Sequence, residues 1–277
     1  MKSQLQNLFN INSKVVVITG AAGLLGRKHA EAVAAFGGVP ILLDISDEVI
    51  NFSTKINNSF GVEAYGIKVD ITNEKEIIES TQEIIKRYGK IDGLVNNAAN
   101  NPKIEKKGQK NFSRLENFSI ESWNQDIAVG LTGAFLCSKH YGSVISENPN
   151  GGSIVNISSD LGLIAPDQRL YYDKSLADNQ QAVKPVTYSI VKTGLVGLTR
   201  YLSSYWADKN VRCNAICPGG VENGQPKSFL DEVSFRIPMN RMAKVDEYQG
   251  ALVWMLSDAS SYLNGAIIPI DGGRTAW

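Results

Sequence analysis

Short apolar runs recur along the chain, and each is followed by a longer segment with helix signals. Residues 14–19 read Lys-Val-Val-Val-Ile-Thr, and mainly apolar runs cover residues 39–43, 154–157 and 213–217. A β-branched apolar run such as the first predicts a strand buried on both faces, as in a parallel sheet. The alternation of these runs with helix signals predicts an α/β fold, in which helices cover both faces of a parallel sheet of about seven strands.

Nothing in the composition divides the chain. It has 277 residues, 43% of them hydrophobic, and it contains no linker rich in proline or glycine. A chain of this length and apolar content can bury one large core. We therefore expect a single domain over residues 1–277.

The first predicted strand ends at a glycine-rich turn. This turn, Gly20-Ala-Ala-Gly23-Leu-Leu25-Gly26, leads into a helix predicted over about residues 24–36. Glycine lets the backbone approach a pyrophosphate closely, and the first amides of the helix point at its negative charge. The unit predicts a doubly wound, Rossmann-type sheet that binds a dinucleotide. A glycine turn without a ligand would show the same pattern.

The second predicted strand ends in an acidic residue. Asp44 lies eighteen positions after Gly26, about where a dinucleotide fold places the carboxylate that binds the ribose diol. Asp44 would repel the additional phosphate of NADP, and Ile45 after it is not basic. We therefore expect NAD as the cofactor, with an exposed carboxylate at a strand end as the alternative.

A tyrosine and a lysine stand four positions apart in a later helical segment. Tyr188 and Lys192 share one helix face at this spacing. A nearby ammonium stabilises a phenolate, whose parent phenol ordinarily has a pKa of about 10. The pair predicts a tyrosine that transfers protons.

Further polar or glycine-containing motifs follow the other predicted strands. They are Asp70-Ile71, Asn97-Ala98, Ser158-Ser159 and Pro218-Gly219-Gly220-Val221. Open α/β sheets bind ligands at the carboxyl ends of their strands. In order and type, the motifs of residues 14–273 resemble the short-chain dehydrogenase/reductase family, in its short single-domain branch. Residues 184–188 and the glycine turn are also similar to members from bacterial surface-sugar pathways, which make flagellin glycans and sialic-acid-like sugars.

This resemblance implies a role for each motif. Ser159 would hold the substrate oxygen, Tyr188 would move the proton, and Lys192 would lower the pKa of the tyrosine while binding the nicotinamide ribose. The implied cofactor contacts are Gly20, Gly23, Leu25, Gly26, Asp44, Asp70, Ile71, Asn97, Ala98, Tyr188, Lys192, Pro218, Gly219 and Val221. The resemblance also implies a homodimer or homotetramer formed by helices near residues 120–146 and 185–207. Three aromatic residues of the second helix are either contact or core residues: Tyr201, Tyr205 and Trp206.

Two departures from the family pattern concern glycines. The turn spaces them as Gly-x-x-Gly-x-x-Gly, which is usual in the extended branch of epimerases and dehydratases. Gly130 stands where the family carries an asparagine that feeds a proton-relay water. A glycine side chain cannot relay a proton, so another group would have to do so. Glycine within a helix also indicates a kink or a close approach.

A third departure is an insertion between two of the motifs. Ser159 and Tyr188 lie 29 positions apart, about twice the family's usual separation. The additional residues fall within 160–185 and predict either a wall of the substrate cleft or a solvent-exposed loop. Tyr172 stands at the usual distance from Ser159, but Leu176 follows where the lysine would be, so Tyr172 is not expected to be catalytic.

Basic residues gather in two predicted substrate loops, near residues 100–115 and 160–185. The first loop contains Lys103, Lys106, Lys107, Lys110 and Arg114, and the second contains Arg169, Lys174 and Lys184. They favour a polar, anionic, sugar-like substrate, although a charge run is often only a solvated face.

Charge and composition exclude other classes. Lys and Arg number 28, as do Asp and Glu, so nothing in the net charge indicates nucleic-acid or membrane binding. The polar first residues do not form a signal peptide, and no apolar run approaches the ~20 residues of a membrane span, so we expect a cytoplasmic protein. Cys137, Cys213 and Cys217 are expected to be buried thiols, and no metal site is expected.

The motifs together predict an NAD-dependent oxidoreductase that interconverts a secondary alcohol and a ketone on a small anionic, sugar-like molecule. The glycine spacing leaves an epimerase or dehydratase that retains NAD as one alternative. Gly130 leaves a non-catalytic dinucleotide-binding sensor as another.

Overall fold

The computed structural model describes residues 7–100 and 113–277 of the chain. Seven parallel strands form one sheet, as predicted, and their order is β3-β2-β1-β4-β5-β6-β7. The strands are β1 (Val15–Thr19), β2 (Val39–Asp44), β3 (Tyr65–Lys68), β4 (Gly93–Asn96), β5 (Gly152–Ile157), β6 (Val211–Pro218) and β7 (Ile267–Ile270). The strand order reverses between β1 and β4, which opens a crevice at their carboxyl ends.

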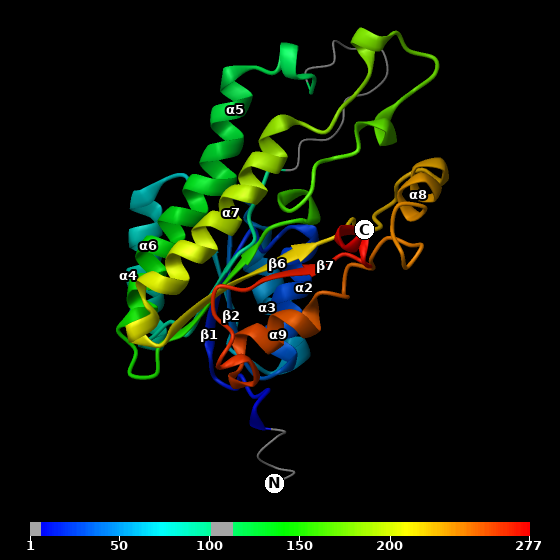
Figure 1. Ribbon diagram of the computed structural model, residues 1–277. Helices are drawn as coiled ribbons and strands as arrows, with labels where there is room; N and C mark the ends of the chain where they lie inside the picture. The colour runs from blue at the N-terminus through cyan, green and yellow to red at the C-terminus, as the bar shows by residue number, and fades with distance from the viewer. Residues whose placement is uncertain (1–6, 101–112) are drawn as a thin grey trace.

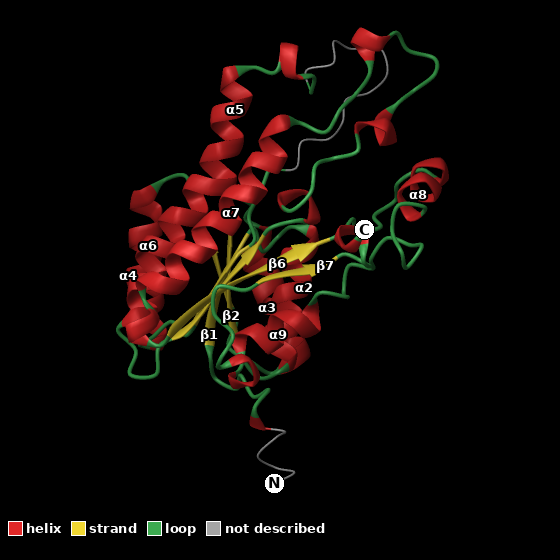
Figure 2. Cartoon of the chain, viewed as in Figure 1, coloured by secondary structure: helices red, strands yellow, loops and turns green. Residues whose placement is uncertain are grey.

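Helices cover both faces of this sheet (Figures 1 and 2). One face carries α2 (Leu24–Ala35), α3 (Glu48–Phe60) and α9 (Gln249–Leu256), and the other carries α4 (Glu74–Tyr88), α6 (Gly133–Ser146) and α7 (Val186–Tyr205). The single-domain, Rossmann-type architecture expected from the alternating pattern is therefore confirmed.

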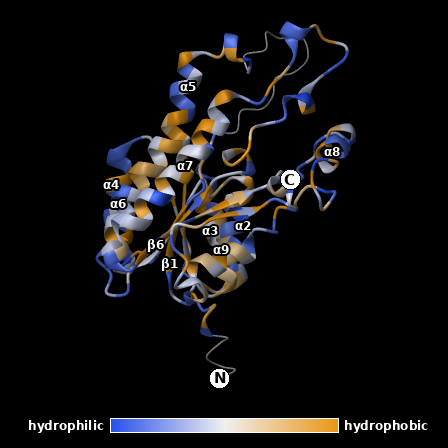
Figure 3. Cartoon of the chain, viewed as in Figure 1, coloured by the Kyte–Doolittle hydropathy of each residue, from blue (hydrophilic) through white to orange (hydrophobic). Residues whose placement is uncertain are grey.

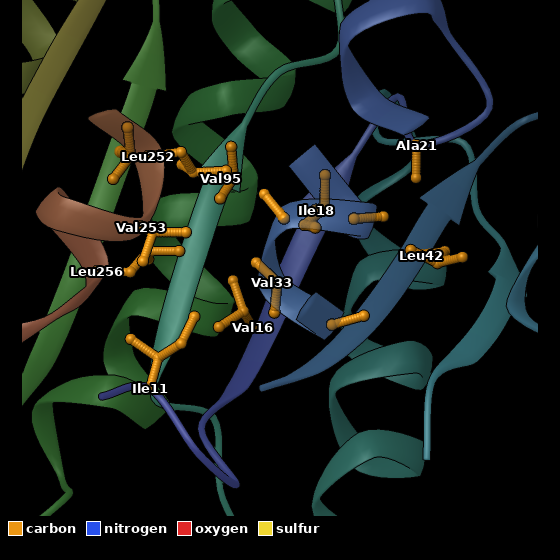
Figure 4. Packing of buried hydrophobic residues seen from close by; sticks show 14 of the residues in the cluster. Ile11, Val16, Ile18, Ala21, Val33, Leu42, Val95, Leu252, Val253 and Leu256 are labelled. Carbon is orange, nitrogen blue, oxygen red and sulfur yellow. The ribbon is translucent and has the colours of Figure 1, made fainter. Parts of the chain in front are cut away.

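Side-chain alternation along β1 divides the core into two layers. Val16 and Ile18 pack against α2 and α9, whereas Val15 and Val17 pack against the opposite helices. Figure 4 shows the first layer, in which Val33 and Leu252 approach β1 and β4 from the helices. Successive side chains of a strand point to opposite faces, so a central strand covered on both sides is apolar throughout.

The helix expected over residues 120–146 is interrupted. It consists of α5 (Ile120–Ile127), one π-helical turn (Ala128–Thr132) and α6. Gly130 is buried in this turn, and a β-carbon there would lie 2.5 Å from a methyl group of Val191 on α7. The expected close approach is therefore present, and the irregularity takes the form of a π-helical turn.

Outside the sheet, two peripheral segments flank its carboxyl edge. Residues 160–185, between β5 and α7, form short 3₁₀ turns, and α8 (Lys227–Ser234) follows β6 (Figure 1). Figure 3 shows predominantly hydrophobic strands at the centre and a largely hydrophilic α8 at the periphery.

The three cysteines are buried and free, as expected. Cys213 and Cys217 lie in β6, and Cys137 lies in α6. Within residues 7–100 and 113–277, no helix combines the length and the apolar content that crossing a bilayer requires.

Candidate active site

A cleft of about 730 Å³ follows the carboxyl edge of the sheet. With one exception, it is lined by all the residues expected to bind the cofactor or catalyse the reaction. They are Gly20, Gly23, Leu25, Asp44, Asp70, Ile71, Asn97, Ala98, Ser159, Tyr188, Lys192, Pro218, Gly219 and Val221. The exception is Gly26, which lies beneath the turn. The fold thus gathers residues from seven separate segments of the chain into one site.

The glycine turn is shaped for close approach to a ligand. Gly20 has a φ of 64°, and a β-carbon on it would lie 2.8 Å from the Cα of Ala98. A β-carbon on Gly26 would lie 2.1 Å from the carbonyl oxygen of Gly20. Both positions therefore require glycine.

The amino end of α2 is open to an anion. Gly23 precedes the helix, no side chain of the described residues caps it, and its first turn contains no acidic residue. The first amides of a helix are unpaired donors with a positive partial charge. These residues fit the pyrophosphate of a dinucleotide.

Asp44 is held beside this turn. Its carboxylate accepts hydrogen bonds from the amide of Ala22 (2.9 Å) and from the amide of Ser46 (3.0 Å). The two bonds fix the carboxylate at the end of β2, and each oxygen keeps a lone pair that a hydroxyl can reach. Asp70, at the other side of the cleft, is tied to its own turn by a 2.7 Å hydrogen bond from Thr72 Oγ1.

Asn97 joins the ends of β1 and β4. Its side-chain amide donates to the carbonyl of Thr19 at 2.9 Å, and its backbone amide donates to the hydroxyl oxygen of Thr19 at 3.0 Å. The amide of Ala98 also donates to that hydroxyl oxygen at 3.0 Å. These bonds keep the crevice between the two strands at a defined width.

Tyr188 and Lys192 lie on the face of α7 that borders the cleft. The Lys192 ammonium is buried, donates to the carbonyl of Ile157 at 2.8 Å, and lies 5.9 Å from the centre of the Tyr188 ring. Burial lowers the pKa of Lys192 to about 8. Burial also raises the pKa of Tyr188, opposed by a hydrogen bond with Ser159. Desolvation is thus the largest influence on the Tyr188 pKa, and the lowering by Lys192 stays a prediction.

Ser159 has a charged neighbour, Asp160, to which the sequence motifs assigned no role. Its hydroxyl donates to the carboxylate of Asp160 at 2.8 Å, and Asp160 pairs with Arg274 at 2.7 Å. Only 4% of the Asp160 side chain and 11% of the Arg274 side chain are exposed. With its proton directed to Asp160, Ser159 presents lone pairs that can accept a hydrogen bond from a substrate hydroxyl.

The pairing of Arg274 with Asp160 could not be predicted from the sequence, because the two residues are 114 positions apart. The available signal for Asp160 was its position directly after the serine pair.

Residues 160–185 form part of the cleft wall, where Pro166, Asp167, Leu170, Tyr171 and Lys184 line it. Tyr172 does not, and 57% of it is exposed. Among the basic residues expected to attract an anion, Lys184 lines the cleft, whereas Arg169 and Lys174 are exposed. Arg114 contacts the carbonyl of Asp178 instead, and Lys103, Lys106, Lys107 and Lys110 lie outside the described residues.

Helix α8 packs against this wall from the opposite side. Arg236, just after α8, pairs with Asp167 at 2.7 Å, and the rings of Tyr171 and Phe229 lie 6.1 Å apart. The short segment after Val221 and the insertion thus close the same end of the cleft together.

Polar groups also surround the position of the missing asparagine. A small cavity of about 10 Å³ touches Gly130, Tyr188 and Lys192 and is also lined by Asp126. Asp126 accepts hydrogen bonds from Asn100 at 3.2 Å and from the hydroxyl of Thr187. This volume matches about one water molecule.

A family model described as short chain dehydrogenase matches residues 14–232. The chain belongs to the short-chain dehydrogenase family. Two relatives of this family show the resemblance over nearly the whole length. An uncharacterized oxidoreductase of Thermotoga maritima is 33% identical over 96% of this chain and 99% of the relative. An NAD-dependent glycerol dehydrogenase of Listeria innocua is 31% identical over 96% of each.

A solved short-chain dehydrogenase structure is similar as well. The crystal structure of a putative gluconate dehydrogenase from Agrobacterium tumefaciens aligns with a TM-score of 0.84 and 26% identity, over 98% of this chain and 99% of that one. The present chain is an NAD(P)-dependent oxidoreductase that acts on CH–OH groups.

Proposed function

We propose that the protein is an NAD-dependent dehydrogenase that interconverts a secondary alcohol and a ketone on a polar, anionic, sugar-like substrate. The observation that carries this proposal is one continuous cleft. The glycine turn and Asp44 stand at its cofactor end, and Ser159, Tyr188 and Lys192 stand at the other end.

Each of these side chains has a defined task in alcohol oxidation. A bound nicotinamide cofactor supplies the hydride acceptor. Ser159 orients the substrate oxygen, while the phenolate of Tyr188 takes the hydroxyl proton. Lys192 is fixed by the carbonyl of Ile157 and keeps a positive charge near the phenolate that accepts this proton.

The preference for NAD rests on Asp44. Its carboxylate is held beside the glycine turn by two amides, where it can accept hydrogen bonds from a ribose diol and repel a 2′-phosphate. Arg27, the basic residue nearest to this turn in the sequence, is paired with Glu48. Isothermal titration of both cofactors tests the preference, and tighter binding of NADP than of NAD would contradict it.

The anionic substrate is supported by the charges at the catalytic end. Lys184, Lys192 and Arg274 line this part of the cleft, as do the acidic residues Asp160 and Asp167. Arg274 neutralises Asp160 and Arg236 neutralises Asp167, so two ammonium groups remain. Such a surplus favours a carboxylate or phosphate in the cleft.

The test is NADH formation over pairs of substrates, each pairing a sugar acid or sugar phosphate with its neutral polyol. We expect turnover of the anionic members and its loss, by a factor of about 10³ or more, in Tyr188→Phe. Turnover of the neutral members alone would contradict the substrate class. Cofactor binding without NADH release on any substrate would favour retained-NAD chemistry or a sensor.

We also propose a homo-oligomer that uses the outer face of α6 and α7. Phe135, Tyr201 and Tyr205 are at least half exposed on these helices, and the two tyrosine rings stack 5.6 Å apart. Trp206, in contrast, packs against the core. Exposed aromatic groups of this kind are enriched in protein interfaces.

A further inference from the structure

Lys184 has no task in the proton transfer of the proposed reaction, although its charge favours an anionic substrate. It stands two positions before α7, and its backbone amide donates to the side-chain oxygen of Gln168 at 2.8 Å. Its ammonium lies 3.7 Å from the centre of the Tyr188 ring and faces the cleft. A cation at this distance lies in direct contact with the π face of the ring.

This ammonium has no carboxylate or carbonyl partner among residues 7–100 and 113–277. Asp160, whose charge raises the pKa of Lys184, is occupied by Arg274, by the hydroxyl of Ser159 and by the amide of Leu161. A largely buried cation without a hydrogen-bonded anion is unfavourable, and burial accordingly lowers the pKa of Lys184 to about 8. Such a group is retained where a negative charge forms next to it.

Two ammonium groups therefore flank one phenol. Lys192 lies 5.9 Å from the ring centre and Lys184 lies 3.7 Å from it. The positive charge of Lys184 repels that of Lys192, so it lowers the pKa of Lys192 in addition to the effect of burial. An ionised Tyr188 between them offsets this repulsion, whereas a neutral phenol does so only through its ring quadrupole.

We propose that Lys184 is a second activating cation of the active site, which stabilises the phenolate of Tyr188 across the face of its ring. The proposal rests on the function proposed above, in which Tyr188 accepts the substrate proton. Lys184 acts through Tyr188 and is thus a positioning residue rather than a catalytic one. Its charge, 3.7 Å from the ring centre, would oppose the desolvation that raises the pKa of Tyr188.

Other ionisable groups around Tyr188 act on the same proton. The charged and titratable side chains nearby are Lys192 on α7, Asp160 after β5, Arg274 at the C-terminal end, Asp126 on α5, Tyr171 in the insertion, and Cys217 and Tyr248. Each of them is unchanged when Lys184 alone is substituted. A difference between variants at position 184 therefore isolates its contribution.

The test compares Lys184→Met and Lys184→Arg with the parent chain, using a neutral alcohol that offers Lys184 no anion to bind. The pH profile of kcat/KM for oxidation is the readout. We expect Lys184→Met to shift the ascending limb of this profile to higher pH by about one unit. At pH values on or below that limb, kcat/KM should fall about tenfold. Lys184→Arg should restore the limb, because a guanidinium keeps its charge. Lys174→Met, an exposed lysine of the same insertion, is the matched control.

A direct titration keeps the proposal testable if a variant turns over too slowly. Tyrosinate absorbance is followed against pH in the full-length protein with and without Lys184→Met, and the contribution of Tyr188 is isolated by subtracting Tyr188→Phe. An upward shift of the Tyr188 titration in Lys184→Met supports the proposal even if no substrate is found. An unchanged titration, or a shift that Lys184→Arg does not reverse, would overturn it.

Discussion

His29 lies fully buried in α2, and neither of its ring nitrogens has a hydrogen-bond partner in the described structure. Burial lowers its pKa from 6.5 to about 4, because the protonated ring would be an unpaired charge in the core. The folded chain thus keeps this histidine neutral over a range in which the unfolded chain protonates it. The contribution of the neutral ring to the free energy of unfolding is complete above pH 6.5 and is lost as the pH falls toward 4.

We predict that His29→Leu weakens this acid sensitivity. The shift corresponds to a loss of up to about 3 kcal/mol in the parent chain between neutral pH and pH 4. Urea unfolding at several pH values measures it, and the difference between variant and parent removes the contribution of the carboxylates. A difference that stays constant from pH 7 to pH 4 would contradict the prediction.

At the scale of elements, the contact between the π-helical turn and α7 decides what residue 130 can be. A β-carbon there would meet Val191 at 2.5 Å, so the family's asparagine has no room. We predict that Gly130→Asn lowers the free energy of unfolding by about 1–3 kcal/mol through overpacking.

Adding Val191→Ala should recover part of this loss, because the shortened side chain makes room for the asparagine. Urea denaturation of the parent chain, both single variants and the double variant gives a double-mutant cycle for this contact. Strictly additive effects would show that the two positions do not clash.

A second element-scale prediction concerns the closure of the cleft by α8 and the insertion. Arg236→Met removes the ion pair with Asp167 and should raise KM several-fold, because α8 and the insertion then hold the substrate end less firmly. Arg169 pairs with the same aspartate, but 83% of its side chain is exposed, so Arg169→Met is the matched control. Equal changes of KM in both variants would argue against a closing role for α8.

At the scale of the whole molecule, the outer face of α6 and α7 predicts association. Placing charges in the stacked pair, in a Tyr201→Glu/Tyr205→Glu variant, should shift sedimentation toward the monomer, because burying two carboxylates without partners is costly. The two rings are 60% and 58% exposed, so the folded chain should tolerate the change. Tyr262→Glu, another fully exposed tyrosine, is the control. A monomeric parent protein would contradict the proposal directly.

Much of the fold and part of the site could be predicted from local sequence. An apolar run such as Val15–Thr19 indicates a strand that is buried on both faces of the sheet. Gly20 and Gly26 stand where a β-carbon would collide with backbone atoms. The strands, the glycine turn and the Tyr188–Lys192 pair, whose members are one helical turn apart, could therefore be predicted from the sequence.

The rest depended on which residues meet across the sheet. Arg274 reaches Asp160 over 114 positions, and Lys184 alone among the basic residues of its insertion turns into the cleft. The direction of the pKa shift at Tyr188 was also decided by the tertiary structure, because desolvation depends on everything packed around the phenol. Local sequence determines periodicity and turns, whereas charge pairing and burial are properties of the assembled fold.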